Sequence, residues 1–139
     1  MEYLCIKISV MELYLTASTR IMDIKKAFNT RFPYLKLEFF SKKHLPGKIS
    51  PMHQKISDKT SLIEVTGVMR EGAIEITAGK TVSQIEHLFQ DKFNLPVQVF
   101  RRTRLGWLET TRTDIFTLGK QNRMGREESH AIYDNEILL

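Results

Sequence analysis

The chain has 139 residues and a formal net charge of +5 at pH 7, and 42% of its residues are hydrophobic while 27% are charged. This length is typical of a single domain, and this composition argues against a globally disordered chain and against a membrane protein. The one cysteine, Cys5, cannot form an internal disulfide. We therefore expect a soluble protein of a reducing compartment, the cytoplasm.

The first segment, residues 1–15, is apolar enough to suggest a signal peptide. Lys7 and Glu12 interrupt the apolar run, however, and no small-residue cleavage site follows it. No other stretch approaches the roughly 18 uncharged apolar residues that a bilayer-spanning helix needs. We interpret the segment as a strand and expect no membrane association.

Two segments, 15–32 and 76–93, share one residue pattern and align without a gap. Apolar side chains recur in both at spacings of three and four, which places them on one face of a helix. These residues are Ile21, Ile24, Phe28 and Phe32 in the first segment, and Val82, Ile85, Phe89 and Phe93 in the second. The pattern predicts two amphipathic helices lying on a core.

Each predicted helix has a start signal. Thr81 and Gln84 have the spacing of a capping box, in which the two side chains bond to each other's backbone amides. For the first helix, Ser18 or Thr19 is the candidate N-cap.

Alternation of apolar and polar residues predicts a strand before and after each helix. The alternating segments are 13–15, 35–40, 74–76 and 97–100. Residues 101–111 then predict an extra hairpin that turns near Leu105 and Gly106. The pentapeptides DKTSL (58–62) and DIFTL (114–118) share an Asp, a hydroxyl residue and a Leu, and each predicts a short helical turn.

The element order predicts one α+β domain over residues 1–126, built from the pseudo-repeats 11–66 and 72–122. A duplicated strand–helix–strand unit is the plan of the ferredoxin-like α/β sandwich, with its four main strands in one sheet. The extra hairpin and an acidic tail at 127–139 would extend that plan. The alternative is a β-grasp-like fold, because helix, Leu-Pro, strand and an Asp-x-x-Thr-Leu turn follow in a similar order in the second half.

Several motifs carry a family resemblance: LPVQVFR (95–101), WLETT (107–111), Asp114, TL (117–118) and QN (121–122), with FPYLKLEFF (32–40) in the first half. Over about residues 11–125, the chain resembles a family of small uncharacterised bacterial proteins of unknown function. The resemblance implies a compact bacterial domain and brings no catalytic residues with it.

No motif predicts catalysis, a metal site or a cofactor. Gly79-Lys80-Thr81 lies between a strand and a helix, as the end of a phosphate-binding loop does, but Ile74 stands where that loop requires a glycine. We interpret it as a helix cap. The four histidines lack paired ligand spacing; they are His44, His53, His87 and His130. We expect the protein not to be an enzyme.

Protein interaction is the function that the sequence favours. If the alternating apolar residues face the helices, several aromatics turn to the open sheet face, and exposed aromatics mark contact surfaces. A strand register shifted by one residue would reverse the two faces. The candidate surface, for a protein partner or for a second copy of the chain, comprises Tyr14, Phe40, Phe100, Arg101, Arg102, Arg104 and Trp107.

Nucleic-acid binding through the basic hairpin and the lysine-rich loop, residues 42–59, is the alternative function. The net charge and the four arginines around Trp107 favour it. The sequence lacks the aromatic motif of RNA-binding sheets. Glu38 and Glu75 are also expected on the outer sheet face, where they would repel phosphate.

Overall fold

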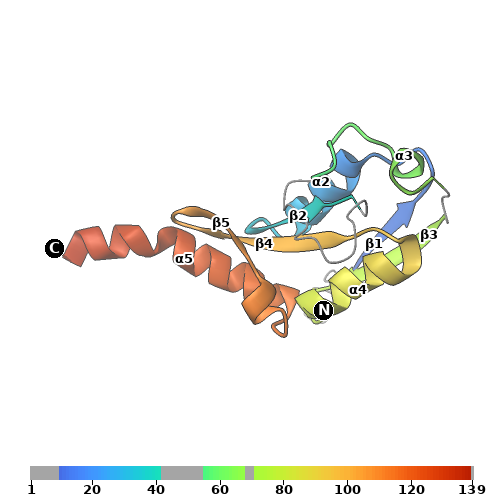
Figure 1. Cartoon of the computed structure of the whole chain (residues 1–139). Helices are drawn as coiled ribbons and strands as arrows, with labels where there is room; N and C mark the ends of the chain where they lie inside the picture. The colour runs from blue at the N-terminus through green and yellow to red at the C-terminus, as the bar shows by residue number, and fades with distance from the viewer. Residues whose placement is uncertain (1–9, 42–54, 68–70, 139) are drawn as a thin grey trace, which may run out of the picture.

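The computed structural model describes residues 10–41, 55–67 and 71–138, with the backbone alone for 131–138. The chain contains both helices and strands (Figure 1), and its strands pair antiparallel, which confirms the α+β prediction. The first half contains β1 (Val10–Leu15), α2 (Ile21–Arg31), β2 (Leu35–Phe39) and α3 (Leu62–Thr66). The second contains β3 (Gly72–Thr77), α4 (Val82–Phe93), β4 (Val97–Thr103), β5 (Gly106–Glu109), the 3-10 helix η1 (Thr111–Thr113) and α5 (Leu118–Leu138).

The strands pair in two antiparallel sheets. One contains β1 and β3, and the other has the order β2-β4-β5. The single four-stranded sheet predicted from the sequence is therefore not observed, and the ferredoxin-like arrangement is not confirmed. The far edge of β2 is occupied, because Ile56 N–H donates to Phe39 O at 2.9 Å and Phe40 bridges Lys55. That edge is the one at which β3 would have to pair.

The core lies between the two helices and the inward faces of the sheets. All eight apolar positions predicted from the helical spacing are buried, which confirms both amphipathic faces. The rings of Phe39 and Phe89 meet edge-on with centroids 5.6 Å apart, and those of Phe28 and Phe32 lie 5.2 Å apart. Removing one such ring costs about 3–5 kcal/mol, so these contacts dominate the stability of the fold.

The two helices predicted from the apolar spacing, α2 and α4, begin differently from one another. Gln84 N–H donates to Thr81 Oγ1 at 3.1 Å and Thr81 N–H donates to Gln84 Oε1 at 2.8 Å, so the predicted capping box of α4 is confirmed. The cap predicted for α2 is wrong: its N-cap residue is Arg20, whose N–H donates to Asp23 Oδ2. Thr19 instead accepts Thr16 N–H, which closes the turn before the helix.

The pentapeptides close the N-terminus of the helix that precedes them. In the first half, Ile21 N–H and Met22 N–H donate to Thr60 O and Asp58 O, at 2.9 and 3.0 Å. In the second half, the amides of residues 82 and 83 donate to the carbonyls of residues 116 and 114, at 3.1 and 2.9 Å. A helix follows each pentapeptide, α3 from Leu62 and α5 from Leu118, and the five-residue α3 confirms the short helical turn predicted in the first half.

α5 is much longer than the turn predicted at 114–118. It continues for 21 residues to Leu138, so the predicted tail at 127–139 begins inside a helix (Figure 1). The start of α5 is packed on the body of the domain: a Cβ atom at Gly125 would lie 2.8 Å from Tyr34 Cβ. Among the described residues, no helix is both long and apolar enough to cross a bilayer.

Candidate functional site

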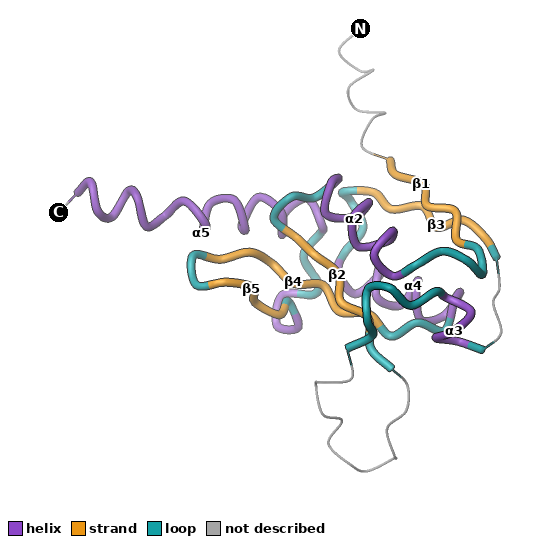
Figure 2. The backbone as a smooth tube through the Cα atoms, turned by 90° about the horizontal axis from the view of Figure 1, so that it is seen from above, coloured by secondary structure: helices purple, strands orange, loops and turns teal. Residues whose placement is uncertain are grey.

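The β4–β5 hairpin and α5 project on the same side of the domain (Figure 2). The hairpin turns at residues 104 and 105, as predicted, and Gly106 adopts a positive φ of 122°, which favours glycine. Thr103 Oγ1 accepts Leu105 N–H at 3.1 Å and donates to Gly106 O at 2.9 Å. The turn is thereby closed by its own side chain, and its tip has a defined shape.

Arg101 joins the hairpin to α5. Its guanidinium donates to Gln121 Oε1 at 2.6 Å and forms an ion pair with Glu128 at 3.0 Å. Gln121 Nε2 in turn donates to Thr113 O at 2.6 Å. Arg101 is only 5% exposed, so its predicted place on the interaction surface is wrong. It lies on the same face of β4 as Val97 and Val99 and therefore points inward.

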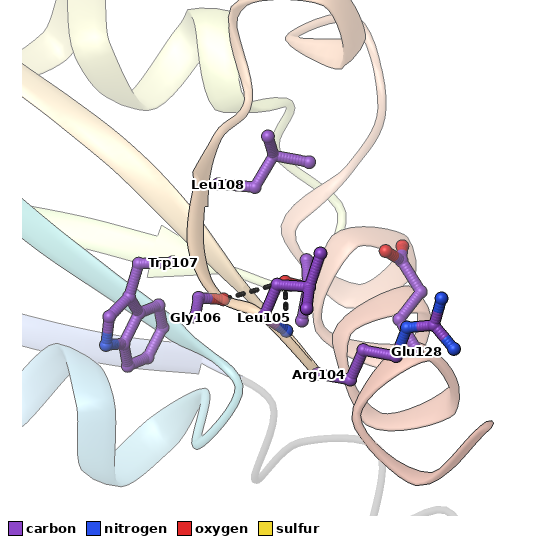
Figure 3. A pocket seen from close by; sticks show the side chains of 7 residues that line it. Arg104, Leu105, Gly106, Trp107, Leu108 and Glu128 are labelled. Carbon is purple, nitrogen blue, oxygen red and sulfur yellow. Dashed lines mark hydrogen bonds between the residues drawn. The ribbon is translucent and has the colours of Figure 1, made fainter. Parts of the chain in front are cut away.

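A hollow lies between the hairpin and α5, and we call it the hairpin hollow. Its volume is about 420 Å³, and its lining residues are Thr103, Arg104, Leu105, Gly106, Trp107, Leu108 and Glu128. Figure 3 shows the leucines on the hairpin and Glu128 on α5. Leu105 is 90% exposed and Leu108 is 47% exposed. The hollow thus presents apolar side chains to solvent beside the outer strand of the sheet.

A second hollow, which we call the α2 groove, lies between α2 and the outer face of the β2-β4-β5 sheet. It has a volume of about 390 Å³ and is lined by Met22, Lys25, Lys26, Asn29, Lys36, Asp58 and Trp107. Its character differs from that of the hairpin hollow. Three lysines and one tryptophan give it a cationic and aromatic lining.

Glu38 lies beside the α2 groove and is only 7% exposed. Lys25 and Lys36 approach its carboxylate at 2.8 and 3.1 Å, and Lys55 lies 3.8 Å away. Burial disfavours the ionised form, but the hydrogen bonds from Lys25 and Lys36 outweigh it and lower the pKa of Glu38. Lys25 also pairs with Asp58 at 2.8 Å. Glu38 is therefore an ionised carboxylate whose charge is offset by lysines, and not the exposed repulsive charge expected from the sequence.

The structure brings together only part of the predicted surface. Phe100, Arg102 and Trp107 lie on one face of the β2-β4-β5 sheet, whereas Tyr14 is exposed on β1 in the other sheet. Phe40 is half-buried beside Lys55, and Arg104 is exposed at the hairpin tip. The expectation of one continuous aromatic face is therefore wrong, because β1 and β4 belong to different sheets.

Cations cover the two aromatics of this face. Lys36 Nζ lies 5.5 Å from the Phe100 ring centroid and 5.0 Å from that of Trp107. The Arg102 guanidinium lies 5.6 Å from the same tryptophan ring, which is 37% exposed. Sequence reasoning missed Lys36 as a site residue. The alternation Leu35, Lys36, Leu37 predicts that Lys36 points away from the two leucines, but it does not show that β4, with Phe100, is the neighbouring strand.

A half-buried carboxyl group lies elsewhere, on α4. Burial raises the pKa of Glu86 to about 7, against the hydrogen bond that it accepts from Val99 N–H at 3.1 Å. A shallow hollow of about 230 Å³ adjoins it, lined by Glu86, His87, Gln90, Pro96 and Val97. The lining places His87 beside this carboxyl group and contains no serine, threonine, cysteine or lysine.

The remaining predicted motifs have structural partners. Lys80 O accepts Leu118 N–H at 2.8 Å, and Thr81 caps α4, so Gly79-Lys80-Thr81 is a helix cap as predicted. His87 Nδ1 lies 2.8 Å from Ser83 O and His130 contacts Tyr34. His44 and His53 lie outside the described residues. Within the described ranges, no three potential ligand side chains gather into a metal site.

Comparison of the chain with models of protein families, with curated proteins and with solved structures gives no match. The family resemblance of the motifs stays a prediction. The two hollows on either side of the hairpin are therefore the basis for a functional proposal.

Proposed function

We propose that the chain is a non-enzymatic, cytoplasmic protein-interaction module that binds an extended segment of a partner protein along β5. The observation that carries this proposal is the apolar hairpin hollow beside an outer strand. Two exposed leucines line it, and β5 is the outermost strand in the order β2-β4-β5. Exposed apolar side chains grouped in a hollow mark an interaction site.

The outer edge of β5 supplies backbone groups for such a segment. Alternate residues of an antiparallel strand direct their N–H and C=O groups to opposite edges, so every second residue of β5 directs them away from β4. Extended peptides bind such edges by adding a strand, and their alternate side chains enter neighbouring pockets. A partner strand on β5 would place its side chains at the hairpin hollow.

Charge indicates the composition of the partner segment. Glu128 in the lining is already paired with Arg101, at 3.0 Å. Arg104 has no ion pair with a carboxylate of the described residues. The charge at the rim that remains available to a ligand is therefore the positive charge of Arg104. It favours a partner segment that has an acidic residue next to its apolar residues.

We infer in addition that the two halves are copies of one unit. The repeated bonds from the starts of α2 and α4 to the pentapeptides support this inference. The hairpin tip and the long α5 follow only the second unit within the described residues. The features proposed for partner binding thus lie where the copies differ.

The test is a screen of the full chain against a library of extended peptides, followed by titration of the selected peptide. We expect apolar peptides with an acidic residue to be selected, and Leu105→Asp with Leu108→Asp to weaken binding at least about tenfold, or about 1.4 kcal/mol. Ile115→Asp is the matched control, since Ile115 is exposed but does not line the hollow. Hydrogen exchange should show protection of the Trp107 and Glu109 amides by the peptide.

Equal binding by the double variant and the control would overturn the proposal. Sedimentation of the free chain tests the other partner suggested by the sequence, a second copy of the chain. A dimer that the leucine substitutions dissociate, together with no selected peptide, would assign the surface to self-association and would also overturn binding of a separate partner.

A further inference from the structure

The α2 groove combines an aromatic wall with a row of amines, and none of its residues except Trp107 belongs to the hairpin hollow. We propose that the groove binds a nucleotide unit, with the base against Trp107 and the phosphate at the lysines of α2 and β2. The inference does not rest on the proposed protein partner, because it concerns the other side of the hairpin.

The charge of the groove favours an anion. Three lysines face one aspartate in the lining. Lys25 and Lys36 are engaged with the carboxylates of Glu38 and Asp58, but Lys26 forms no ion pair with a described carboxylate. Lys26 also lies on the exposed face of α2. A phosphate at the groove would therefore meet one ammonium group without an ion pair, that of Lys26, beside two lysines whose charges are offset by Glu38 and Asp58.

The aromatic wall favours a planar group next to that anion. The Trp107 ring is 37% exposed, and Lys36 and Arg102 lie 5.0 and 5.6 Å from its centroid. An indole ring stacks any base, and nearby cations can bind the adjoining phosphate. Base and phosphate would thus contact neighbouring groups of one surface.

The side chain of Asn29 offers a polar group that could hydrogen-bond to the edge of the base. The Asn29 amide nitrogen donates to Leu35 O at 2.9 Å and to Pro33 O at 3.4 Å. These bonds hold the carboxamide, and its oxygen has no hydrogen bond within the described part of the chain. A carbonyl oxygen in this position accepts from an N–H donor of a base edge, either the exocyclic amino group of adenine or the ring imino group of uracil. The groove volume, about 390 Å³, suits one nucleotide.

The nucleotide can be free or one unit of a single strand, and the probes separate these sources. Trp107 is the only tryptophan in the chain, so its fluorescence reports on the groove directly. One arm titrates the full chain with AMP and ATP, and the other with a short single-stranded oligouridylate, at about 50 mM and about 200 mM salt. Base stacking should quench the emission, and added salt should weaken the binding.

The variants test the residues. Lys26→Glu should weaken binding at least tenfold, and Trp107→Ala should do the same when a labelled oligouridylate is followed by anisotropy. Lys120→Glu is the control, because it makes the same charge change at an exposed lysine of α5 outside the groove. Lys26 has no described contact that folding requires, so its variant tests the site even if Trp107→Ala unfolds the chain.

Each outcome decides the proposal. Quenching by AMP or ATP that Lys26→Glu abolishes supports a free nucleotide, and quenching by the oligouridylate alone supports a single strand. No quenching by any probe at low salt overturns the inference. Binding that Lys26→Glu and Lys120→Glu weaken equally also overturns it, since it would then depend on general charge. The leucine variants of the hairpin hollow should leave the binding unchanged, which separates the two proposals.

Discussion

The guanidinium of Arg101 donates to the carboxamide oxygen of Gln121 at 2.6 Å, and both side chains are buried. Arg101 belongs to β4 and Gln121 to α5, so this bond joins the strand that carries the hairpin to the helix that faces it. Tyr34 adds a second connection, because its N–H donates to Asn122 Oδ1 and its carbonyl accepts Arg102 N–H, both at 2.8 Å. Two sets of hydrogen bonds, one through Arg101 and one through Tyr34, thus connect β4 to α5 beside the hairpin hollow.

Replacing Arg101 with Ala should lower the free energy of unfolding by about 2–3 kcal/mol, because it leaves the buried Gln121 oxygen without its charged donor. Urea denaturation measures the change. Arg102→Ala is the matched control, since Arg102 is the exposed neighbour on the other face of β4, and it should cost less than about 1 kcal/mol. Equal losses in the two variants would show that the Arg101 bonds do not stabilise the fold.

Glu38→Gln should destabilise the protein at neutral pH and have little effect in acid. The folded-state pKa of Glu38 lies below the ordinary value of 4.5, since the lysine hydrogen bonds outweigh the burial. Its contribution is therefore present above pH 4.5 and is lost as the pH falls through the folded pKa. We expect a loss of about 1–3 kcal/mol at pH 7, from the charged hydrogen bonds that disappear.

Denaturation of Glu38→Gln and wild type at a series of pH values measures this difference, with the exposed Glu75→Gln as control. A difference that stays constant from neutral to acid pH would contradict the role of the Glu38 charge.

Glu86→Gln should have the opposite pH dependence. Burial raises the folded-state pKa of Glu86 to about 7, above the ordinary value of 4.5, so the folded state favours the protonated carboxyl group. The resulting stability is fully present below pH 4.5 and is lost as the pH rises through about 7. At pH values above that pKa, the neutral amide should stabilise the protein by about 1–2 kcal/mol, a figure reduced for the partial exposure of the group.

The measurement is again the free energy of unfolding, here compared between weakly acidic and weakly alkaline solution. A carboxyl titration followed by NMR checks the pKa of Glu86 itself. If the group titrates at its ordinary value, the stabilisation by Glu86→Gln above pH 7 is not expected.

Much of the local structure follows from the sequence alone, although the N-cap of α2 and the length of α5 do not. The apolar spacings of Ile21 to Phe32 and Val82 to Phe93 correctly predict two helices and the faces that they bury. The Thr81–Gln84 capping box and the turn near Gly106 are also confirmed. These features depend on residues a few positions apart, and side-chain periodicity and backbone preferences act at that range.

The tertiary structure alone decided which distant segments meet. β2 pairs with β4 along one edge, and Ile56 N–H donates to Phe39 O at the other edge, and no local pattern encodes which segment takes which edge. Alternation within each strand separates Arg101 from Phe100 and Lys36 from Leu35, but it does not relate the faces of the two strands or say which face is covered. α5 buries Arg101, and the β4–β5 hairpin brings Trp107 to Lys36. The long-range packing that makes these contacts also forms the two hollows on which the functional proposals rest.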